Sequence, residues 1–281
     1  MTVFLNGQFV PEEQAVVSVF DRGFLYGDGL YEALRICNGK PFRWAKHLER
    51  FNRGAAFLKI RVPFKADELR EQALELVRLN RMPEALLRIL LSRGIGPRGF
   101  SPKGASNPAL VMTLHPAPDT NVKPLPAWRV ISASSRLPAN EPLSLFKNCN
   151  RLPQILAKAE ADAAGADEAL LLNTSGEIVE ASASNLFWIR DNVVCTPPLT
   201  SGILAGVTRL IVFEICRKLG VPTRETGIAP KELREAQGVF LSLSSWGIIE
   251  VVSLDQHDLE RSPLVKRIQS DYETVLRSES E

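Results

Sequence analysis

Residues 146–188 read FKNCNRLPQILAKAEADAAGADEALLLNTSGEIVEASASNLFW and contain the clearest secondary-structure signals of the chain. The spacing of its apolar residues predicts a helix that begins near Leu152 and ends at Gly165, because glycine adopts the positive φ at which many helices terminate. Short apolar runs at 169–172, 177–181 and 185–195 follow and are typical of strands.

The N-terminal part predicts antiparallel sheet followed by two helices. Asn6-Gly7 and Asn38-Gly39 each lie between apolar runs, which is the strongest short-range signal for a hairpin. We therefore expect antiparallel strands over residues 1–40. Apolar residues at helical spacing then predict a helix from Trp44 to Leu58 and a second from the N-cap Asp67 to about Val77, with strands near 86–92 and 109–114.

A proline-rich stretch divides the chain. Residues 115–126, HPAPDTNVKPLP, contain four prolines and no periodic apolar pattern, which is typical of a linker. We predict a small N-terminal domain over 1–118, an interdomain linker over 119–127 and a larger C-terminal domain over 128–281. The C-terminal domain should contain a strand at 128–134, a helix from Val207 that Gly220 stops, and a final helix opened by Ser262-Pro263.

Charge and cysteine usage exclude several classes of protein. The chain of 281 residues has 34 Lys and Arg against 32 Asp and Glu, and its net charge of +2 is too small for a nucleic-acid-binding surface. Its four cysteines and three histidines are scattered, so we expect no metal site and reduced thiols. No signal segment or membrane-spanning run is evident. We therefore predict a soluble cytoplasmic protein that binds neither nucleic acid nor membrane.

A glycine-rich segment matches the dinucleotide-binding pattern G-x-G-x-x-G at Gly94, Gly96 and Gly99. That pattern requires a helix directly afterwards, and none is expected here, so we interpret the segment as a loop between strands. Its Arg93 and Arg98 could still bind a carboxylate in bidentate fashion.

A second segment, GILAGVTR at 202–209, is a better candidate for anion binding. It runs straight into a helix, where free amides, the helix dipole and the Thr208 hydroxyl could converge on a phosphate. Many helices begin in this way without a ligand. Serines of the later run FLSLSSWG, Ser244 among them, could add donors or could only satisfy local backbone.

Lys147 and Glu180 each allow two interpretations. Lys147 follows the apolar run LSLF, and a lysine at the end of a buried strand can have its pKa lowered for Schiff-base chemistry. Glu180 is an acid in a run of apolar or small residues, and a buried carboxylate needs a cationic partner. The alternative for both is an ordinary structural or exposed position.

Eight motifs, taken together and in this order, resemble the class IV aminotransferases, the fold-type IV enzymes that use pyridoxal 5'-phosphate (PLP). This family includes branched-chain aminotransferases, D-amino-acid transaminases and 4-amino-4-deoxychorismate lyases. The resemblance covers nearly the whole chain and implies a two-domain α+β or α/β fold, with a small N-terminal α/β domain and a larger C-terminal pseudo-barrel domain. The motifs are FLNGQFV, DRGFLYGDGLYEALR, HLERF, SRGIGPRG, FKNCNRLPQILAKAEA, GADEALLLNTSGEIVEASASNLFW, TPPLTSGILAGVTR and FLSLSSWGIIEV.

The resemblance also implies roles for individual residues. Lys147 looks like the lysine that bonds to the cofactor and later carries the proton, and Glu180 looks like the acid that pairs with the pyridine nitrogen. Arg50, which could otherwise be a solvated residue, looks like a phosphate ligand, together with Val207, Thr208 and Ser244.

Further residues fall where members of the family contact the substrate or position the lysine. The resemblance implies an amino substrate with a carboxylate, and a homodimer in which the loop that carries Arg98 reaches the active site of the partner subunit. Arg98 is the best candidate for the substrate carboxylate. The substrate-pocket positions are Tyr31, Arg35, Arg88 and Arg98, and Asn150 and Arg151 would position the lysine or the edge of the cofactor.

The reaction is the finer question. SRGxGxRG, K-x-x-N-R at 147–151, SNLFW and TPPLxxGILxGVTR look most like the lyases, which give p-aminobenzoate and pyruvate for folate biosynthesis. The alternative is transamination of a branched-chain or D-amino acid with 2-oxoglutarate or pyruvate. Gly99 and Phe100 replace the R-x-H signature of the D-amino-acid enzymes, and Arg151 replaces a tyrosine of the branched-chain enzymes. Two positions also depart from the lyase pattern: Phe100 where tyrosine is common, and Ser244 where threonine is common in the wider family.

Overall fold

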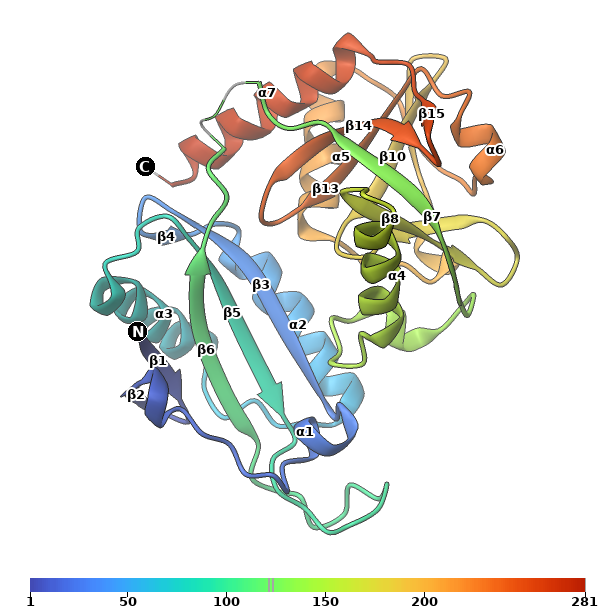
Figure 1. The fold of residues 1–281 in the computed structure, drawn as a ribbon. Coiled ribbons are helices and arrows are strands. Elements are labelled where there is room, and N and C mark those ends of the chain that lie inside the picture. Colours follow the sequence, from blue (N-terminus) through green and yellow to red (C-terminus); the bar gives the residue numbers. More distant parts are fainter. Residues whose placement is uncertain (121, 123, 281) are drawn as a thin grey trace. The chain divides into compact units, whose positions relative to one another are not determined.

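A computed structural model describes residues 1–120, 122 and 124–280, which form two compact units (Figure 1). Unit 1 contains residues 1–117, 146–150 and the described residues from Leu276 onward. Unit 2 contains residues 151–275 and the described residues of 118–145. Asn121 and Lys123 of the predicted linker and Glu281 of the predicted C-terminal domain lie outside the described residues, and the predicted extents of the domains stay a prediction.

Unit 1 is built on a six-stranded antiparallel sheet in the order β2-β1-β6-β5-β3-β4. Both predicted hairpins are confirmed: Asn6-Gly7 joins β1 to β2 and Asn38-Gly39 joins β3 to β4, and all four residues have positive φ. Asparagine and glycine adopt this conformation most readily in two-residue turns. The strands are β1 (Thr2–Leu5), β2 (Gln8–Pro11), β3 (Gly29–Cys37), β4 (Lys40–Pro41), β5 (Ala85–Ser92) and β6 (Ala109–Pro116).

Residues 12–28 depart from the expected sheet. A 3-10 helix, η1, covers Glu12–Gln14, and a short helix, α1, covers Arg22–Tyr26. Asp21 caps α1 by accepting a hydrogen bond from the Gly23 amide at 2.7 Å, and Gly27 ends the helix in the left-handed conformation. A cap and a stop this close together favour one helical turn over an extended strand.

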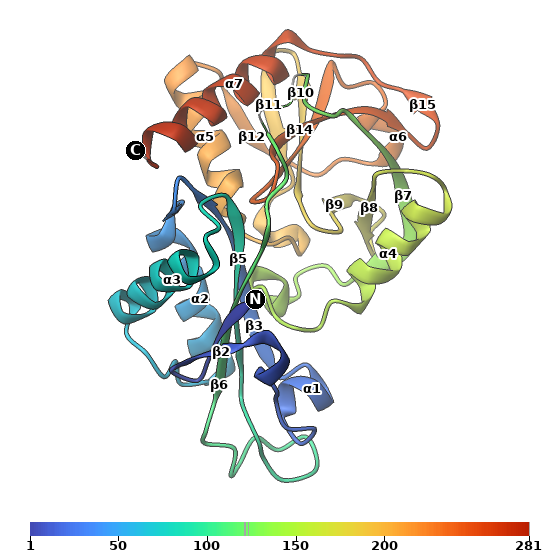
Figure 2. The same cartoon turned by 60° about the vertical axis from the view of Figure 1, so that its left-hand side comes forward.

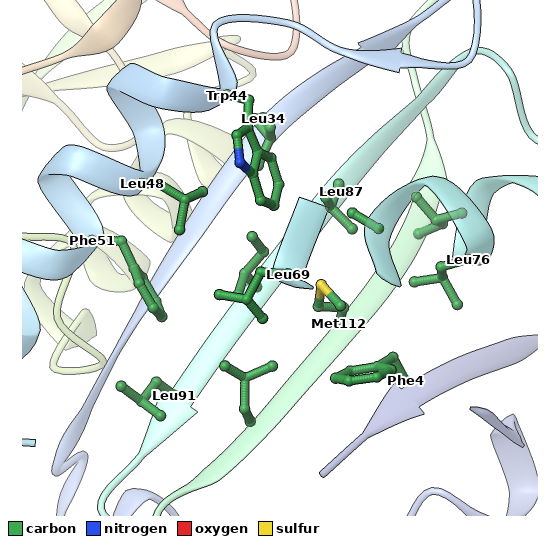
Figure 3. Packing of buried hydrophobic residues seen from close by; sticks show 14 of the residues in the cluster. Phe4, Leu34, Trp44, Leu48, Phe51, Leu69, Leu76, Leu87, Leu91 and Met112 are labelled. Atoms are coloured by element: carbon green, nitrogen blue, oxygen red, sulfur yellow. The ribbon is translucent and has the colours of Figure 1, made fainter. Parts of the chain in front are cut away.

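Two helices, α2 (Trp44–Leu58) and α3 (Ala66–Asn80), pack on the sheet of unit 1 (Figure 1 and Figure 2). The predicted bounds of α2 are confirmed. Asp67 is not the N-cap of α3. Lys65 stands at the N-cap position, two residues earlier, and its amide donates to Glu68 Oε2 at 2.9 Å. Figure 3 shows the core between helices and strands, with labelled side chains from Phe4, Leu34, Trp44, Leu48, Phe51, Leu69, Leu76, Leu87, Leu91 and Met112.

Unit 2 is built on a nine-stranded mixed sheet. Six of its strands, in the order β10-β13-β14-β7-β8-β9, form a closed ring because β9 pairs with β8 and, through Glu180 and Asn185, with β10. This closure is the predicted pseudo-barrel. The strands are β7 (Trp128–Leu137), β8 (Glu168–Asn173), β9 (Ile178–Ala181), β10 (Asn185–Arg190), β11 (Val193–Thr196), β12 (Thr223–Glu225), β13 (Gly238–Leu243), β14 (Gly247–Leu254) and β15 (His257–Asp258).

Helices α4, α5 and α6 lie between these strands in the sequence, and α7 follows the last strand. Helix α4 packs against β7 and β8, and α5 packs against β13. Gly220 ends α5 in the left-handed conformation, as predicted. Helix α4 ends two residues before Gly165, which has a φ of 65°. The remaining elements are listed by their bounds: η2 (Pro142–Leu145), α4 (Leu152–Ala163), η3 (Leu199–Ser201), α5 (Val207–Leu219), α6 (Pro230–Leu233) and α7 (Pro263–Ser278).

Two predictions for the region of unit 2 were wrong. The single strand expected over 185–195 is two strands, because Asp191 and Asn192 both have positive φ and form a hairpin turn between β10 and β11. The apolar run LSLF before Lys147 is not a buried strand, because residues 142–145 form the 3-10 helix η2, which begins at Pro142. Within the described residues, no helix combines the length and the apolar character needed to cross a lipid bilayer.

Candidate active site

Main-chain hydrogen bonds fix the segment that carries Lys147 beside strand β3. The Tyr31 amide donates to the Lys147 carbonyl at 2.8 Å, and the Cys149 amide donates to the Gly29 carbonyl at 3.0 Å. Asn150 adds a third link, because its Nδ2 donates to the Gly27 carbonyl at 3.2 Å. Lys147 therefore has the rigid attachment that a covalently acting lysine needs.

The amine of Lys147 lies over the ring of Tyr31. Its Nζ is 4.7 Å from the ring centroid, and Cζ of Arg88 is 4.2 Å from the same centroid. Arg88 comes from β5, where it is in register with Ala33, the neighbour of Tyr31 on the same face of the sheet. Each cation–π contact contributes about 0.5–2 kcal/mol. Two cations around one aromatic ring create a region that attracts an anionic group, such as a substrate carboxylate.

Arg50 belongs to a buried cluster with two residues that the sequence did not single out, Glu32 and His47. Glu32 lies on β3 among apolar residues, and Arg50 binds it in bidentate fashion, with Nε 2.7 Å from Oε1 and Nη2 2.7 Å from Oε2. His47 Nδ1 is 2.8 Å from the same Oε2. All three side chains are buried, with Glu32 only 1% exposed.

The cluster has a defined charge state at neutral pH. Burial would raise the pKa of Glu32, but the Arg50 charge and the hydrogen bonds from His47 and Arg50 outweigh it and lower this pKa from 4.5 to about 2. Burial lowers the pKa of His47 from its ordinary value of 6.5, against the smaller opposing effect of Glu32. Since a carboxylate only accepts, a neutral His47 must carry its proton on Nδ1 and donate it to Glu32.

Glu180 is buried on β9 and binds the loop that precedes α5. Its Oε2 accepts a hydrogen bond from the Leu204 amide at 2.9 Å. Asn185, its register partner on β10, donates from Nδ2 to the Leu204 carbonyl at 2.9 Å. Both polar main-chain groups of Leu204 are therefore held by neighbouring strands of the closed sheet, and the loop is fixed relative to the carboxylate.

The start of α5 is suited to an anion. Gly206 is its N-cap and supplies no side-chain cap for the first amides of the helix, Val207 and Thr208. A Cβ at Gly206 would lie 1.9 Å from Asn185 Oδ1, so this close approach requires glycine. Val207 and Thr208 are both buried. Uncapped amides at the positive end of the helix dipole are typical phosphate donors.

Serines lie beside Asn185, the residue that approaches Gly206, and in the turn after β13. Ser242, the register partner of Asn185 on β13, has a buried hydroxyl, as does Ser184, and neither has a hydrogen-bond partner among the described residues. Ser244 lies half-buried in the turn after β13. A buried hydroxyl without a partner is costly, so these groups fit a site that accepts the phosphate and ring of a bound cofactor.

Arg35 pairs with a surface acid. It lies farther along β3 than Tyr31, and its Nη2 is 2.9 Å from Oε2 of Glu84. Arg151 stands at the N-cap position of α4. Neither observation tests the predicted roles, which stay predictions.

Arg98 is exposed in a loop over residues 93–108 between β5 and β6, which confirms the interpretation of the G-x-G-x-x-G segment. Buried Arg22 holds this loop, since Nη1 donates to the Gly99 carbonyl at 2.8 Å and Nη2 donates to the Phe100 carbonyl at 3.1 Å. The Phe100 side chain is 88% exposed. The loop is thus anchored by its backbone and presents Arg98 and Phe100 outward.

Three further residues, Glu32, His47 and Asn185, organise the site without having been predicted. A signal for Glu32 existed: β3 alternates, and Glu32 falls on the same face as the buried Leu30 and Leu34. An acid on a buried face needs a cation, which is the reasoning that identified Glu180. Asn185 gave no comparable signal, because its partner Leu204 is distant in the sequence.

Known proteins resemble this chain over nearly its full length. The sequence model of the family described as "Amino-transferase class IV" matches residues 29–254. D-alanine aminotransferase of Staphylococcus aureus is 32% identical over 286 residues, covering 99% of this chain and 99% of that protein. Branched-chain amino acid aminotransferase of Escherichia coli has a structure with a TM-score of 0.92 and 28% identity, covering 100% of this chain and 96% of that chain. The structure of 4-amino-4-deoxychorismate lyase from Pseudomonas aeruginosa gives a TM-score of 0.83 and 31% identity, covering 96% of this chain and 97% of that chain.

Proposed function

The chain belongs to the class IV aminotransferase family, and we propose its reaction on that basis. Enzymes of this family depend on PLP, so the chain is a PLP-dependent enzyme. We assign Lys147 as the residue that bonds to the PLP aldehyde and Glu180 as the partner of the pyridine nitrogen. Arg50, Val207, Thr208 and Ser244 are assigned to the phosphate group. The bound cofactor supplies an electron sink that stabilises the carbanion formed at the amine-bearing carbon of the substrate.

Lys147 acts as the acid–base residue. Once the substrate amine has taken its place, Nζ of Lys147 removes the proton from the amine-bearing carbon. Its main chain is held on β3 and its amine lies over Tyr31, so the proton-accepting atom returns to the same position in each turnover. This fixed geometry supports the assignment.

Glu180 controls protonation at the far end of the cofactor. A buried carboxylate beside the pyridine nitrogen favours the protonated ring, because the opposite charge stabilises the cationic form. The Leu204 amide binds Oε2 at 2.9 Å and so fixes the rotation of the carboxylate. The same contact sets the loop that leads to the phosphate-binding amides of α5.

The preferred reaction is that of a 4-amino-4-deoxychorismate lyase, which releases p-aminobenzoate and pyruvate in the folate pathway. The observation that carries this choice is the anchored loop in which Arg98 is followed by Gly99 and Phe100 rather than by the histidine of an R-x-H signature. Loss of the substrate proton leads to expulsion of the enolpyruvyl group, since aromatisation of the ring favours this bond cleavage. Arg98 is assigned to a substrate carboxylate, and Tyr31, Arg35 and Arg88 to the substrate pocket.

Transamination is the second candidate. The observation in its favour is the 32% identity over the full length to a D-alanine aminotransferase. In that reaction Lys147 would deliver the proton that it removed, and the product would be an oxo acid.

One experiment separates the two reactions. The PLP-loaded protein is incubated with 4-amino-4-deoxychorismate while p-aminobenzoate fluorescence is followed, and in parallel with branched-chain and D-amino acids plus 2-oxoglutarate. Rapid release of p-aminobenzoate supports the lyase. Formation of an oxo acid from an amino acid without p-aminobenzoate overturns that choice in favour of the aminotransferase.

We also propose a cytoplasmic homodimer. Unit 1 exposes a run of large apolar side chains over residues 16–24, and Phe20 and Phe24 are 66% and 70% exposed. Several large apolar side chains exposed within one short segment are typical of a protein interface. Light scattering should give twice the chain mass of 31.1 kDa, and Phe20→Ser with Phe24→Ser should shift the protein toward monomer. A monomeric wild-type protein would contradict the proposal.

A further inference from the structure

Glu32 is a buried acid on an otherwise apolar face of β3. Residues Leu30, Leu34 and Ile36 of the same strand face are fully buried in the core of unit 1. A buried carboxylate is costly unless it is paired and hydrogen-bonded. Glu32 meets that condition with three donors, Arg50 Nε, Arg50 Nη2 and His47 Nδ1, all within 2.8 Å.

The contact fixes the direction of the Arg50 guanidinium. Both nitrogens on one edge of the fork, Nε and Nη2, are bound by Glu32 at 2.7 Å. A planar guanidinium held along one edge cannot rotate about its long axis. The opposite edge, with Nη1, is therefore presented in a single orientation, which is the requirement for repeated recognition of a phosphate oxygen.

His47 fixes the carboxylate in turn. It lies one helical turn before Arg50 on α2, so both side chains project toward β3. Its Nδ1 donates to Oε2, the oxygen that also accepts from Arg50 Nη2. A change in the rotation of Glu32 would break bonds to two residues at once. Neutral His47 adds this restraint without adding a second cation.

We propose that Glu32 and His47 are positioning residues that hold Arg50 in the orientation in which it binds the phosphate group of the cofactor. The inference rests on the proposed role of Arg50 as a phosphate ligand. Neither residue touches the reacting atoms, so their effect is exerted on cofactor affinity through Arg50. A purely structural role would instead weaken the fold and affect all ligands alike.

The test compares two ligands that differ only in the phosphate. Dissociation constants for PLP and for pyridoxal, which lacks the phosphate, are measured by fluorescence titration of the apoprotein. The PLP-to-pyridoxal ratio of the dissociation constants separates phosphate recognition from binding at Lys147, and this ratio rises when phosphate recognition is lost. For Glu32→Gln and for His47→Ala we expect PLP affinity to fall on the order of tenfold, with pyridoxal affinity nearly unchanged. His47→Asn keeps a donor near the Nδ1 position and should restore most of the PLP affinity.

A control removes a buried carboxylate from an ion pair elsewhere. Glu250 is buried on β14 and pairs with Arg261, whose side chain is 56% exposed, so Glu250→Gln breaks a Glu–Arg pair in unit 2 without touching Arg50. This variant should lower the melting temperature and leave the PLP-to-pyridoxal ratio as in the wild type. If Glu32→Gln fails to fold, the test compares the PLP-to-pyridoxal ratio of His47→Ala with that of His47→Asn.

The outcomes separate the inference from the proposed function. Arg50→Ala tests the phosphate assignment itself: an unchanged ratio in that variant overturns the role of Arg50 and the inference with it. A raised PLP-to-pyridoxal ratio of dissociation constants in Arg50→Ala, together with an unchanged ratio in Glu32→Gln and His47→Ala, overturns the positioning role alone. Equal loss of affinity for both ligands in those two variants also overturns it, because the effect is then structural.

Discussion

Replacing the buried ion pair by the double variant Glu32→Gln/Arg50→Met should make the free energy of unfolding less sensitive to acid. The pKa of Glu32 is lowered from 4.5 to about 2, which corresponds to roughly 3 kcal/mol of stability at neutral pH. Because the pKa is depressed in the folded state, this stability is present above pH 4.5 and is lost as the pH falls toward 2. Between about pH 5 and about pH 3.5 the linkage relation removes roughly 1.2 kcal/mol.

The double variant is preferred to Glu32→Gln alone, because removing one partner leaves the other charge uncompensated at a cost of about 3–5 kcal/mol. In the double variant, the Gln carbonyl still accepts from His47 Nδ1, and no charge remains buried. Urea unfolding followed by circular dichroism at about pH 5 and about pH 3.5 should show a loss in the wild-type protein that is larger by about 1 kcal/mol than in the double variant. Equal losses in the two proteins would refute the charge state assigned to Glu32.

Four further substitutions test single contacts. Lys147→Ala should no longer be trapped covalently with PLP by borohydride, and a labelled peptide elsewhere in the chain would remove Lys147 from its role. Glu180→Ala should retain PLP but lose turnover by about a hundredfold or more, and an unaffected rate would exclude Glu180 from the mechanism. Gly206→Ala should weaken PLP binding, because its Cβ would lie 1.9 Å from Asn185 Oδ1; unchanged affinity by fluorescence titration would contradict this close approach. Arg98→Ala should raise KM for an acidic substrate more than the Kd for PLP, whereas equal changes in both constants would indicate a structural role.

Local sequence signals predicted the elements that are decided by a few neighbouring residues. The hairpins at Asn6-Gly7 and Asn38-Gly39 follow from the positive φ that these residues adopt. The end of α5 at Gly220 follows from the same property. Asp191-Asn192 was missed because the pair lacks glycine, although asparagine and aspartate also adopt the left-handed conformation.

Contacts between residues far apart in the sequence could not be predicted from local pattern. The bonds from residues 147 and 149 to β3 span more than 100 positions of the chain. From local pattern alone, Lys147 was therefore expected at the end of a strand, whereas it follows a 3-10 helix. The Glu32–Arg50 pair required knowing that β3 and α2 face each other. The motif resemblance identified Lys147, Glu180 and Arg50 as candidates, and the structure adds the neighbours that hold them.

The reaction of the PLP-loaded protein with 4-amino-4-deoxychorismate tests the lyase assignment, with Lys147→Ala as the control. We expect p-aminobenzoate and pyruvate in equal amounts from the wild-type protein and neither from the variant. Oxo acid formation from an amino acid, with no p-aminobenzoate from 4-amino-4-deoxychorismate, would contradict the lyase assignment. Equal p-aminobenzoate release by Lys147→Ala would contradict the assigned role of Lys147.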